Sequence, residues 1–242
     1  DRVALFMNNC PQYVIAHYGI QKLGAIVGPC GPLFKSHELE YQLCDLGAEV
    51  AIVADSLHPV LAAVSHKTAI KHVFVVNYGD LLPPAPGINL PDELRAAKSS
   101  PAGSEDFLAA LAAVAGAPPH PAIGMDDVCL MTYTSGTTGL PKGAMLSHRN
   151  ALYKTSAASD HNRVEREDTL LAIAPLYHIA GMLFGIDVTI YTGATTVLMF
   201  RFDPLATLQA IERHRVSWWY SIAPMNVACM QVPDAARYDL SS

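Results

Sequence analysis

Hydroxyl residues and glycines crowd one short stretch of this chain, and a single lysine follows them. The stretch contains Thr134, Ser135, Gly136, Thr137, Thr138 and Gly139, and the lysine is Lys142. Backbone N–H groups at glycines can turn into a concave nest that holds an anion. Hydroxyls add donors, and the lysine adds a positive point charge suited to phosphate. These residue types predict a phosphate-binding loop, with a nucleotide triphosphate as the expected ligand.

Two other interpretations of the loop stay open on these residues alone. A Walker A loop has Ser or Thr directly after its Gly-Lys pair and leads into a helix. Here Lys142 lies between Pro141 and Gly143, and the apolar run that follows at residues 144–146 is typical of a strand. This spacing disfavours a P-loop NTPase. The bland alternative is a flexible turn rich in Thr and Gly, in which Lys142 is simply solvated.

The elements on either side of the loop suggest how it is held. The apolar run at residues 128–131 predicts a buried strand. Ser147 is a suitable N-cap for a helix over residues 148–159. The loop is therefore expected to join two strands as a hairpin. Its N–H groups and hydroxyls, rather than a helix dipole, would then hold the phosphate.

Short apolar strands alternate with amphipathic helices along the rest of the chain. Strands are expected at residues 3–7, 25–29, 49–54, 72–76, 170–174, 195–199 and 218–222. Helices are expected at residues 11–23 (with Pro11 at the first helical position), 36–46 (with Ser36 as N-cap), 57–69, 107–114, 179–189, 204–214 and 225–231. This alternation predicts an α/β fold with parallel pairing and right-handed crossovers.

Two successive strand–helix series imply two stacked, mostly parallel β-sheet subdomains flanked by helices. The first is expected at residues 1–125, with a proline- and alanine-rich excursion at 83–121 that is interpreted as peripheral and without chemistry. The second is expected at residues 126–242 and opens with the phosphate-binding loop. The two subdomains are free to interleave.

Composition limits the function classes. The chain has 242 residues, of which 51% are hydrophobic and 16% charged, so it is globular. Its formal net charge of −6 gives no electrostatic footprint for nucleic acid. Five widely spaced cysteines without a CxxC motif favour buried thiols in a reducing compartment. No signal peptide and no clean transmembrane run are visible, so a soluble, cytoplasmic protein is expected.

A second candidate site follows a buried strand further along the chain. His178 comes shortly after the apolar run at residues 170–174, and α/β folds bind ligands at the exits of their strands. A lone histidine is more often a core residue bonded to the backbone. Met225 and the nearby tryptophans are more typical of core packing than of a cofactor site. The acidic residues, Asp45 among them, form no paired constellation and are interpreted as solvated caps.

Two motifs resemble those of a known family. Residues 133–143, YTSGTTGLPKG, resemble the AMP-binding signature of the adenylate-forming enzymes, which include acyl-CoA synthetases, aryl-CoA ligases, luciferases and peptide-synthetase adenylation domains. Residues 175–181, PLYHIAG, resemble the family's second motif and lie at the spacing that the family shows. The resemblance covers nearly the whole chain and is nearest to acyl-CoA synthetases acting on fatty or similar acids.

The resemblance implies a reaction and its co-substrates. Such enzymes join a carboxylic acid to ATP as an acyl-adenylate and then transfer the acyl group to coenzyme A. Lys142 and the loop at residues 134–139 would hold the β- and γ-phosphates, and Thr134 would be the partner of Mg²⁺ or phosphate. The expected partners are therefore a carboxylic acid, ATP and coenzyme A, with no nucleic acid; a homodimer is left open.

The resemblance also implies roles at the second motif. In the family, the histidine that matches His178 lies beside the acyl carboxylate and helps to shape the acid and pantetheine channels. Tyr177 would line the substrate pocket. Met225 belongs to a segment that resembles the family's acyl-pocket helix, although the neighbouring Asn226 and Val227 do not match the aromatic that gates long-chain members.

Several family parts have no match in the chain. These are the Tyr-Gly-x-Thr-Glu motif, the ribose-binding Asp, the hinge and the C-terminal domain with its catalytic Lys. The resemblance thus indicates a truncated N-terminal domain of the acyl-CoA synthetase-like fold, expected to be inactive in isolation. The alternative is a non-catalytic nucleotide- or acyl-binding module derived from the same fold.

Overall fold

The computed structural model describes residues 1–88, 90–134 and 139–242. These residues form two compact units, one made of Asp1–Leu81 with Arg95–Ala151 and the other of Leu82–Leu94 with Leu152–Ser242. The boundary expected after residue 125 falls inside the first unit, because the strands on both sides of the loop belong to its sheet. The chain also interleaves, since residues 82–94 belong to the second unit.

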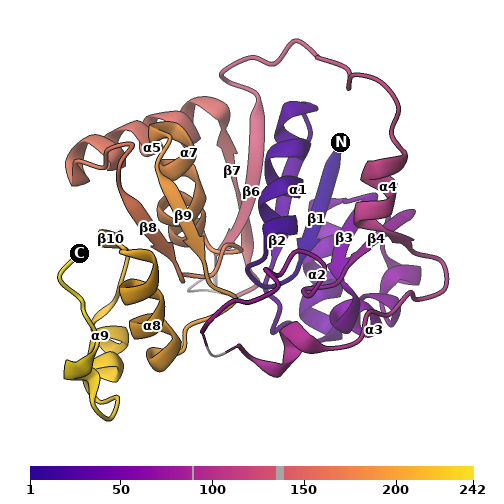
Figure 1. Cartoon of the computed structure of the whole chain (residues 1–242). Helices are drawn as coiled ribbons and strands as arrows, with labels where there is room; N and C mark the ends of the chain where they lie inside the picture. Colours follow the sequence, from indigo (N-terminus) through magenta and orange to yellow (C-terminus); the bar gives the residue numbers. More distant parts are fainter. Residues whose placement is uncertain (89, 135–138) are drawn as a thin grey trace. The chain divides into compact units, whose positions relative to one another are not determined.

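The first unit is built on one mixed sheet (Figure 1). Its described strands lie in the order β5-β4-β3-β1-β2-β6-β7. Every neighbouring pair is parallel except the last, β6–β7, which is antiparallel. The strands are β1 (Arg2–Phe6), β2 (Ile26–Cys30), β3 (Val50–Ala54), β4 (His72–Val76), β5 (Glu105–Asp106), β6 (Val128–Thr134) and β7 (Lys142–Ser147). The predicted parallel α/β order and the predicted hairpin are both confirmed.

Crossover helices cover this sheet. α1 (Pro11–Lys22) connects β1 to β2, and α2 (Ser36–Leu46) returns to β3 on the other side of β1. Right-handed crossovers in opposite directions place the two helices on opposite faces. α2 packs its buried leucines against inward-facing residues of β1 and β3; these leucines are Leu39, Leu43 and Leu46. α3 (His58–Ala62) and α4 (Phe107–Ala113) complete this unit's helices within the described ranges, and α5 (His148–Asn162) begins at its end.

Two predicted details of these helices are wrong. The N-cap of α2 is Lys35 rather than Ser36, because the Lys35 backbone N–H donates to the Glu38 carboxylate at 2.7 Å and fixes the turn one residue earlier. The helix expected at residues 57–69 is short: α3 is flanked by two 3₁₀ turns, η1 (Asp55–Leu57) and η2 (Ser65–Lys67).

The second unit has a smaller parallel sheet. Its described strands lie in the order β10-β8-β9, namely β10 (Trp218–Trp219), β8 (Thr169–Ala172) and β9 (Thr195–Leu198). Alternate side chains of β8 enter two cores, because successive residues of a strand point to opposite faces. Leu171 packs with α8 (Pro204–His214) and Leu170 packs with Leu183 and Val188. α9 (Ala223–Met230) follows β10.

The single helix expected at residues 179–189 is divided into three parts. They are α6 (Ile179–Met182), the π-helical turn η4 (Leu183–Asp187) and α7 (Val188–Thr192). The π turn holds Gly185 against β8, where an added Cβ would lie 3.2 Å from the Ala172 Cβ and from Leu176. π turns are rare and frequently mark functional sites.

Cysteines and hydropathy agree with a packed globular chain. All five cysteines are free; four are buried and Cys44 is exposed. Burial raises the pKa of the Cys10 and Cys30 thiols to about 12, so both stay protonated and unreactive near neutral pH. Across the described residues, no helix has the length and apolar character needed to cross a bilayer.

His17 on α1 predicts loss of stability in acid. Its side chain is buried, and burial lowers its pKa to about 4. In the unfolded chain the pKa is near 6.5. Above that pH both states are neutral at this site; below it, only the unfolded state gains a proton, so folding stability falls until the folded pKa is reached. We expect His17 to lower the free energy of unfolding by roughly 2 kcal/mol between pH 7 and pH 5.

Urea unfolding of the wild type and of His17→Asn at several pH values checks this expectation. The variant should be less stable at pH 7 but should lose less stability on acidification. Parallel pH profiles for the two proteins would show that His17 does not carry the acid sensitivity.

Candidate functional site

The β6–β7 hairpin brings two predicted site residues together. Its register pairs Thr134 with Lys142 and Tyr133 with Gly143 (Figure 1). Directly opposed residues in an antiparallel pair have Cβ atoms about 5 Å apart. The Lys142 side chain is exposed. Thr134, which carries a hydroxyl, and Lys142, which carries an ammonium group, are therefore opposed across the hairpin where the strands give way to the loop.

The structure describes only some of the predicted loop residues. Gly139, at the end of the loop, has a φ of 148°, which favours glycine. The other loop positions predicted to bind phosphate lie outside the described residues: Ser135, Gly136, Thr137 and Thr138. Their role in phosphate binding stays a prediction.

Two tyrosines fasten the base of the loop to α2. The Tyr133 hydroxyl donates to Asp45 Oδ2 at 2.7 Å, and the Tyr41 hydroxyl donates to the Pro141 carbonyl at 2.8 Å. Burial, with the Asp45 carboxylate second, raises the pKa of Tyr133 above its usual range, so the phenol remains a donor. The interpretation of Asp45 as a solvated cap is wrong, because a residue 88 positions away uses its carboxylate.

Gly143 makes room for the Tyr133 ring. A Cβ at Gly143 would lie 2.3 Å from Met131 Cε and 3.1 Å from Tyr133 Cζ. The glycine after Lys142 therefore has a packing reason of its own. It lets the ring that carries the hydroxyl lie across the hairpin and reach Asp45.

The helix after the hairpin starts as the sequence predicts. The Ser147 hydroxyl accepts from the Asn150 backbone N–H at 3.2 Å, and Asn150 Oδ1 accepts from the Ser147 N–H at 3.0 Å. This reciprocal pair caps α5. Because α5 starts only after β7, the loop itself does not open a helix, which distinguishes it from a Walker A loop.

His178 lies in the second unit, in the turn after β8. Its backbone N–H donates to the Pro175 carbonyl at 3.0 Å, and its Nδ1 accepts from the Ala180 N–H at 3.3 Å. The side chain is exposed, so the core interpretation of this histidine is wrong. With Nδ1 used as an acceptor, the neutral ring carries its proton on Nε2 and can donate to an oxygen ligand.

Gly181 makes this turn possible. A Cβ at this position would lie 1.9 Å from the Pro175 carbonyl oxygen and 2.8 Å from the Ala174 carbonyl oxygen. The first turn of α6 therefore packs directly on the backbone that leaves β8. This close approach fixes the direction in which His178 leaves the strand.

The two predicted pocket residues differ in their surroundings. Tyr177 is half-buried beside His178. Met225 is half-buried and packs against the core around Leu171 and Ile173. The packing of Met225 bears out the sequence argument for a core position, while its place in the substrate pocket stays a prediction.

Sequence reasoning missed an aromatic group near the exit of β8. Phe184, on the π turn, stacks on Tyr220 with ring centroids 4.7 Å apart and planes 5° apart. Its ring also contacts Trp218, at 5.6 Å between centroids. The 3.6-residue period of an α-helix does not apply across the π turn, so the sequence pattern does not show which face of the helix carries Phe184.

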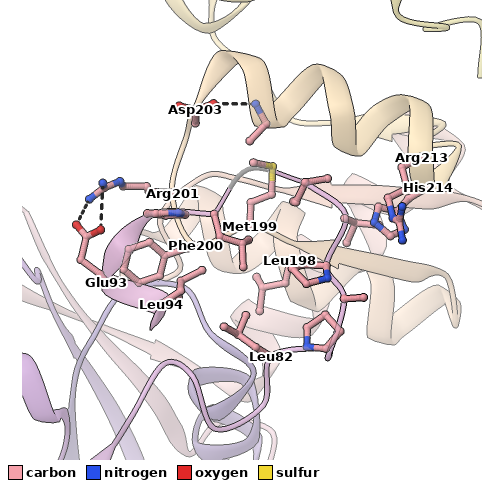
Figure 2. A pocket seen from close by; sticks show the side chains of 18 of the residues that line it. Leu82, Glu93, Leu94, Leu198, Met199, Phe200, Arg201, Asp203, Arg213 and His214 are labelled. Atoms are coloured by element: carbon pink, nitrogen blue, oxygen red, sulfur yellow. Dashed lines mark hydrogen bonds and ion pairs between the residues drawn. The ribbon is translucent and has the colours of Figure 1, made fainter. Parts of the chain in front are cut away.

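A cavity of about 800 Å³ lies elsewhere in the second unit. The residue 82–94 segment, β9 and α8 form its walls (Figure 2). Figure 2 shows the Glu93–Arg201 ion pair at one end and Arg213 with His214 at the other. The excursion interpreted as peripheral thus supplies one wall of this cavity, and none of the predicted site residues that the structure describes lines it.

The whole chain, residues 1–242, matches the AMP-binding enzyme family. It belongs to that family. The chain is 32% identical to a long-chain-fatty-acid–CoA ligase of Bacillus subtilis, over 100% of the chain and 45% of the relative. It is 31% identical to a feruloyl-CoA synthase of Amycolatopsis, over 100% and 42%. It thus spans less than half the length of these curated relatives.

Solved structures confirm the fold of the chain. The inhibitor-bound N-terminal domain of FACL13 from Mycobacterium tuberculosis has a TM-score of 0.77 and 26% identity, with 99% of this chain and 54% of that one covered. The anthranilate CoA ligase AuaEII, in complex with anthranoyl-AMP, has a TM-score of 0.81 and 24% identity, with 100% and 43% covered. The predicted class, two mostly parallel sheets flanked by helices, is therefore correct.

Proposed function

We propose that the full-length protein is an AMP-forming ligase that activates a carboxylic acid with ATP and passes the acyl group to coenzyme A. The observation that carries the proposal is the hairpin register, which pairs Thr134 with the exposed Lys142 at the base of the signature loop. Membership of the AMP-binding family supports it. The proposed location is the cytoplasm, where ATP and coenzyme A are both present.

Lys142 and the loop would act on the triphosphate by charge and position. Attack of a carboxylate on the α-phosphate expels pyrophosphate, and it brings negative charges together. A fixed cation beside the β- and γ-phosphates lowers the resulting repulsion, and backbone donors orient the leaving group. No described side chain near Thr134 and Lys142 has to act as an acid or base in this step.

The described residues fit a Mg²⁺ ion that arrives with the nucleotide. They contain no cluster of three or more His, Cys, Asp or Glu side chains able to hold a metal. Mg²⁺ in nucleotide sites takes few protein ligands and several phosphate and water oxygens, where it neutralises phosphate charge. Thr134 would supply its hydroxyl oxygen as the protein ligand.

The second motif would bind the acid. The Nε2–H of His178 can donate to a carboxylate oxygen, because Nδ1 already accepts from the Ala180 N–H. Tyr177 and Met225 would line the acyl pocket. A fatty acid is the proposed substrate, supported by the 32% identity to the Bacillus subtilis ligase.

Acid-dependent exchange of labelled pyrophosphate into ATP by the full-length protein tests the proposal. The acid panel should contain fatty acids of increasing length together with 4-coumarate, ferulate and anthranilate. We expect exchange only when an acid is present, with the highest rate for a fatty acid. A preference for an aromatic acid would contradict the proposal of a fatty-acid substrate but would agree with the proposed reaction. ATP binding without exchange for any acid would indicate a non-catalytic module, and hydrolysis without acid would indicate an NTPase.

A further inference from the structure

The hairpin that carries the loop lies at the end of the described sheet. β7 is the last strand of the described sheet, and β6 is paired with β2 at one position, Val27 with Leu130. The upper part of the hairpin therefore extends beyond the position at which β6 pairs with β2. This part consists of residues 131–134 and 142–144. Such an overhang is free to twist and bend unless side chains hold it.

One helix holds both sides of this overhang. Tyr41 and Asp45 are four residues apart on α2, so they project from the same face. Asp45 accepts from the Tyr133 hydroxyl, in the strand that enters the loop. Tyr41 donates to the Pro141 carbonyl, where the chain leaves the loop. Each end of the loop is thus bonded once to α2, next to the residues that carry the hydroxyl and the ammonium.

α2 is itself a fixed support. Its opposite face is buried in the core of the first unit. Gln42, between the two contact residues, donates from its buried Nε2 to the Pro29 carbonyl at 2.8 Å, at the end of β2. The Tyr133 ring packs against the same core. A displacement of the loop base would therefore have to break its two hydrogen bonds to α2, which is itself fixed to the core and to β2.

We propose that Tyr41 and Asp45 are positioning residues that fix the spacing and orientation of the two ends of the phosphate-binding loop. They touch no phosphate; they act through Tyr133 and Pro141 on the placement of Thr134 and Lys142. The inference rests on the proposed function, because only a loop that binds the triphosphate makes its spacing matter. Its consequence is specific: loss of the two bonds weakens use of ATP and leaves use of the acid unchanged.

Steady-state adenylation by the full-length protein tests this with five variants. Tyr41→Phe and Tyr133→Phe each remove one hydroxyl and keep the ring. We expect Tyr41→Phe to raise KM for ATP about threefold to tenfold, the range of a neutral hydrogen bond, and Tyr133→Phe to raise it about tenfold or more, because its hydroxyl donates to a carboxylate. The double variant should raise KM for ATP by at least the product of the two single-variant factors. Asp45→Asn keeps an oxygen acceptor and should behave like the wild type, whereas Asp45→Ala should match Tyr133→Phe.

The readouts separate positioning from a general structural role. KM for the acid and kcat should change by less than twofold, and the melting temperature by less than about 2 °C. The control is Tyr153→Phe, at an exposed tyrosine on α5, which should show equally small changes. An unchanged KM for ATP in the double variant, or a parallel loss of every parameter together with the melting temperature, would overturn the inference. If the wild type itself shows no acid-dependent exchange, the proposed function fails first, and the two failures are thereby distinguished.

Discussion

Replacing Lys142 with alanine is expected to lower kcat/KM for adenylation by roughly 10- to 100-fold, the range of a hydrogen bond to a charged group. The side chain is exposed, so the melting temperature should not change. Lys142→Arg should restore only part of the activity, because a planar guanidinium presents its donors differently from a compact ammonium. Pyrophosphate exchange with the best acid, together with thermal unfolding, measures both effects.

Lys154→Ala is the matched control, since Lys154 is an exposed lysine on α5. It removes the same charge from the protein and should leave exchange unchanged. An equal loss in Lys154→Ala and Lys142→Ala would reduce the effect to net charge. Full activity in Lys142→Ala would refute its role in the triphosphate site.

Gly181→Ala should disable the second motif. The new Cβ would lie 1.9 Å from the Pro175 carbonyl oxygen, and backbone on both sides has to move. Overpacking of this kind costs about 1–3 kcal/mol. The backbone that moves is the one that directs His178, so we expect KM for the acid to rise while KM for ATP changes little. Urea unfolding and adenylation kinetics report the two effects.

Gly19→Ala supplies the control for Gly181→Ala. Gly19 lies inside α1, and a Cβ there meets nothing within 4 Å. Replacing a glycine by alanine within a helix should stabilise the protein by roughly 0.5–1 kcal/mol. If Gly181→Ala were tolerated as well as Gly19→Ala, the close approach at Pro175 would not constrain the turn.

The sequence was most informative where local pattern decides structure. The apolar run at residues 72–76 placed β4, Pro204 placed the start of α8, and the Ser147 cap placed the start of α5. The hairpin followed from two apolar runs around the glycine-rich loop. These features depend on neighbours within a few positions, which a single sequence contains.

The rest depends on contacts between residues far apart in the chain. The bonds from Tyr41 and Asp45 to the loop join positions 100 and 88 residues apart, and nothing local marks them. The π turn at Leu183–Asp187 lies where Gly185 meets β8, whereas the sequence predicted one regular helix there. The motif string indicated His178, but only the structure shows that its Nδ1 is already engaged.

Titration of ATP and AMP into the full-length protein and into Lys142→Ala tests the central claim most directly. If Lys142 holds the β- and γ-phosphates, the variant should bind ATP roughly tenfold or more weakly and should bind AMP as tightly as the wild type, because AMP has only the α-phosphate. Equal weakening for ATP and AMP, or unchanged affinity for both, would contradict the placement of the triphosphate at the base of this loop.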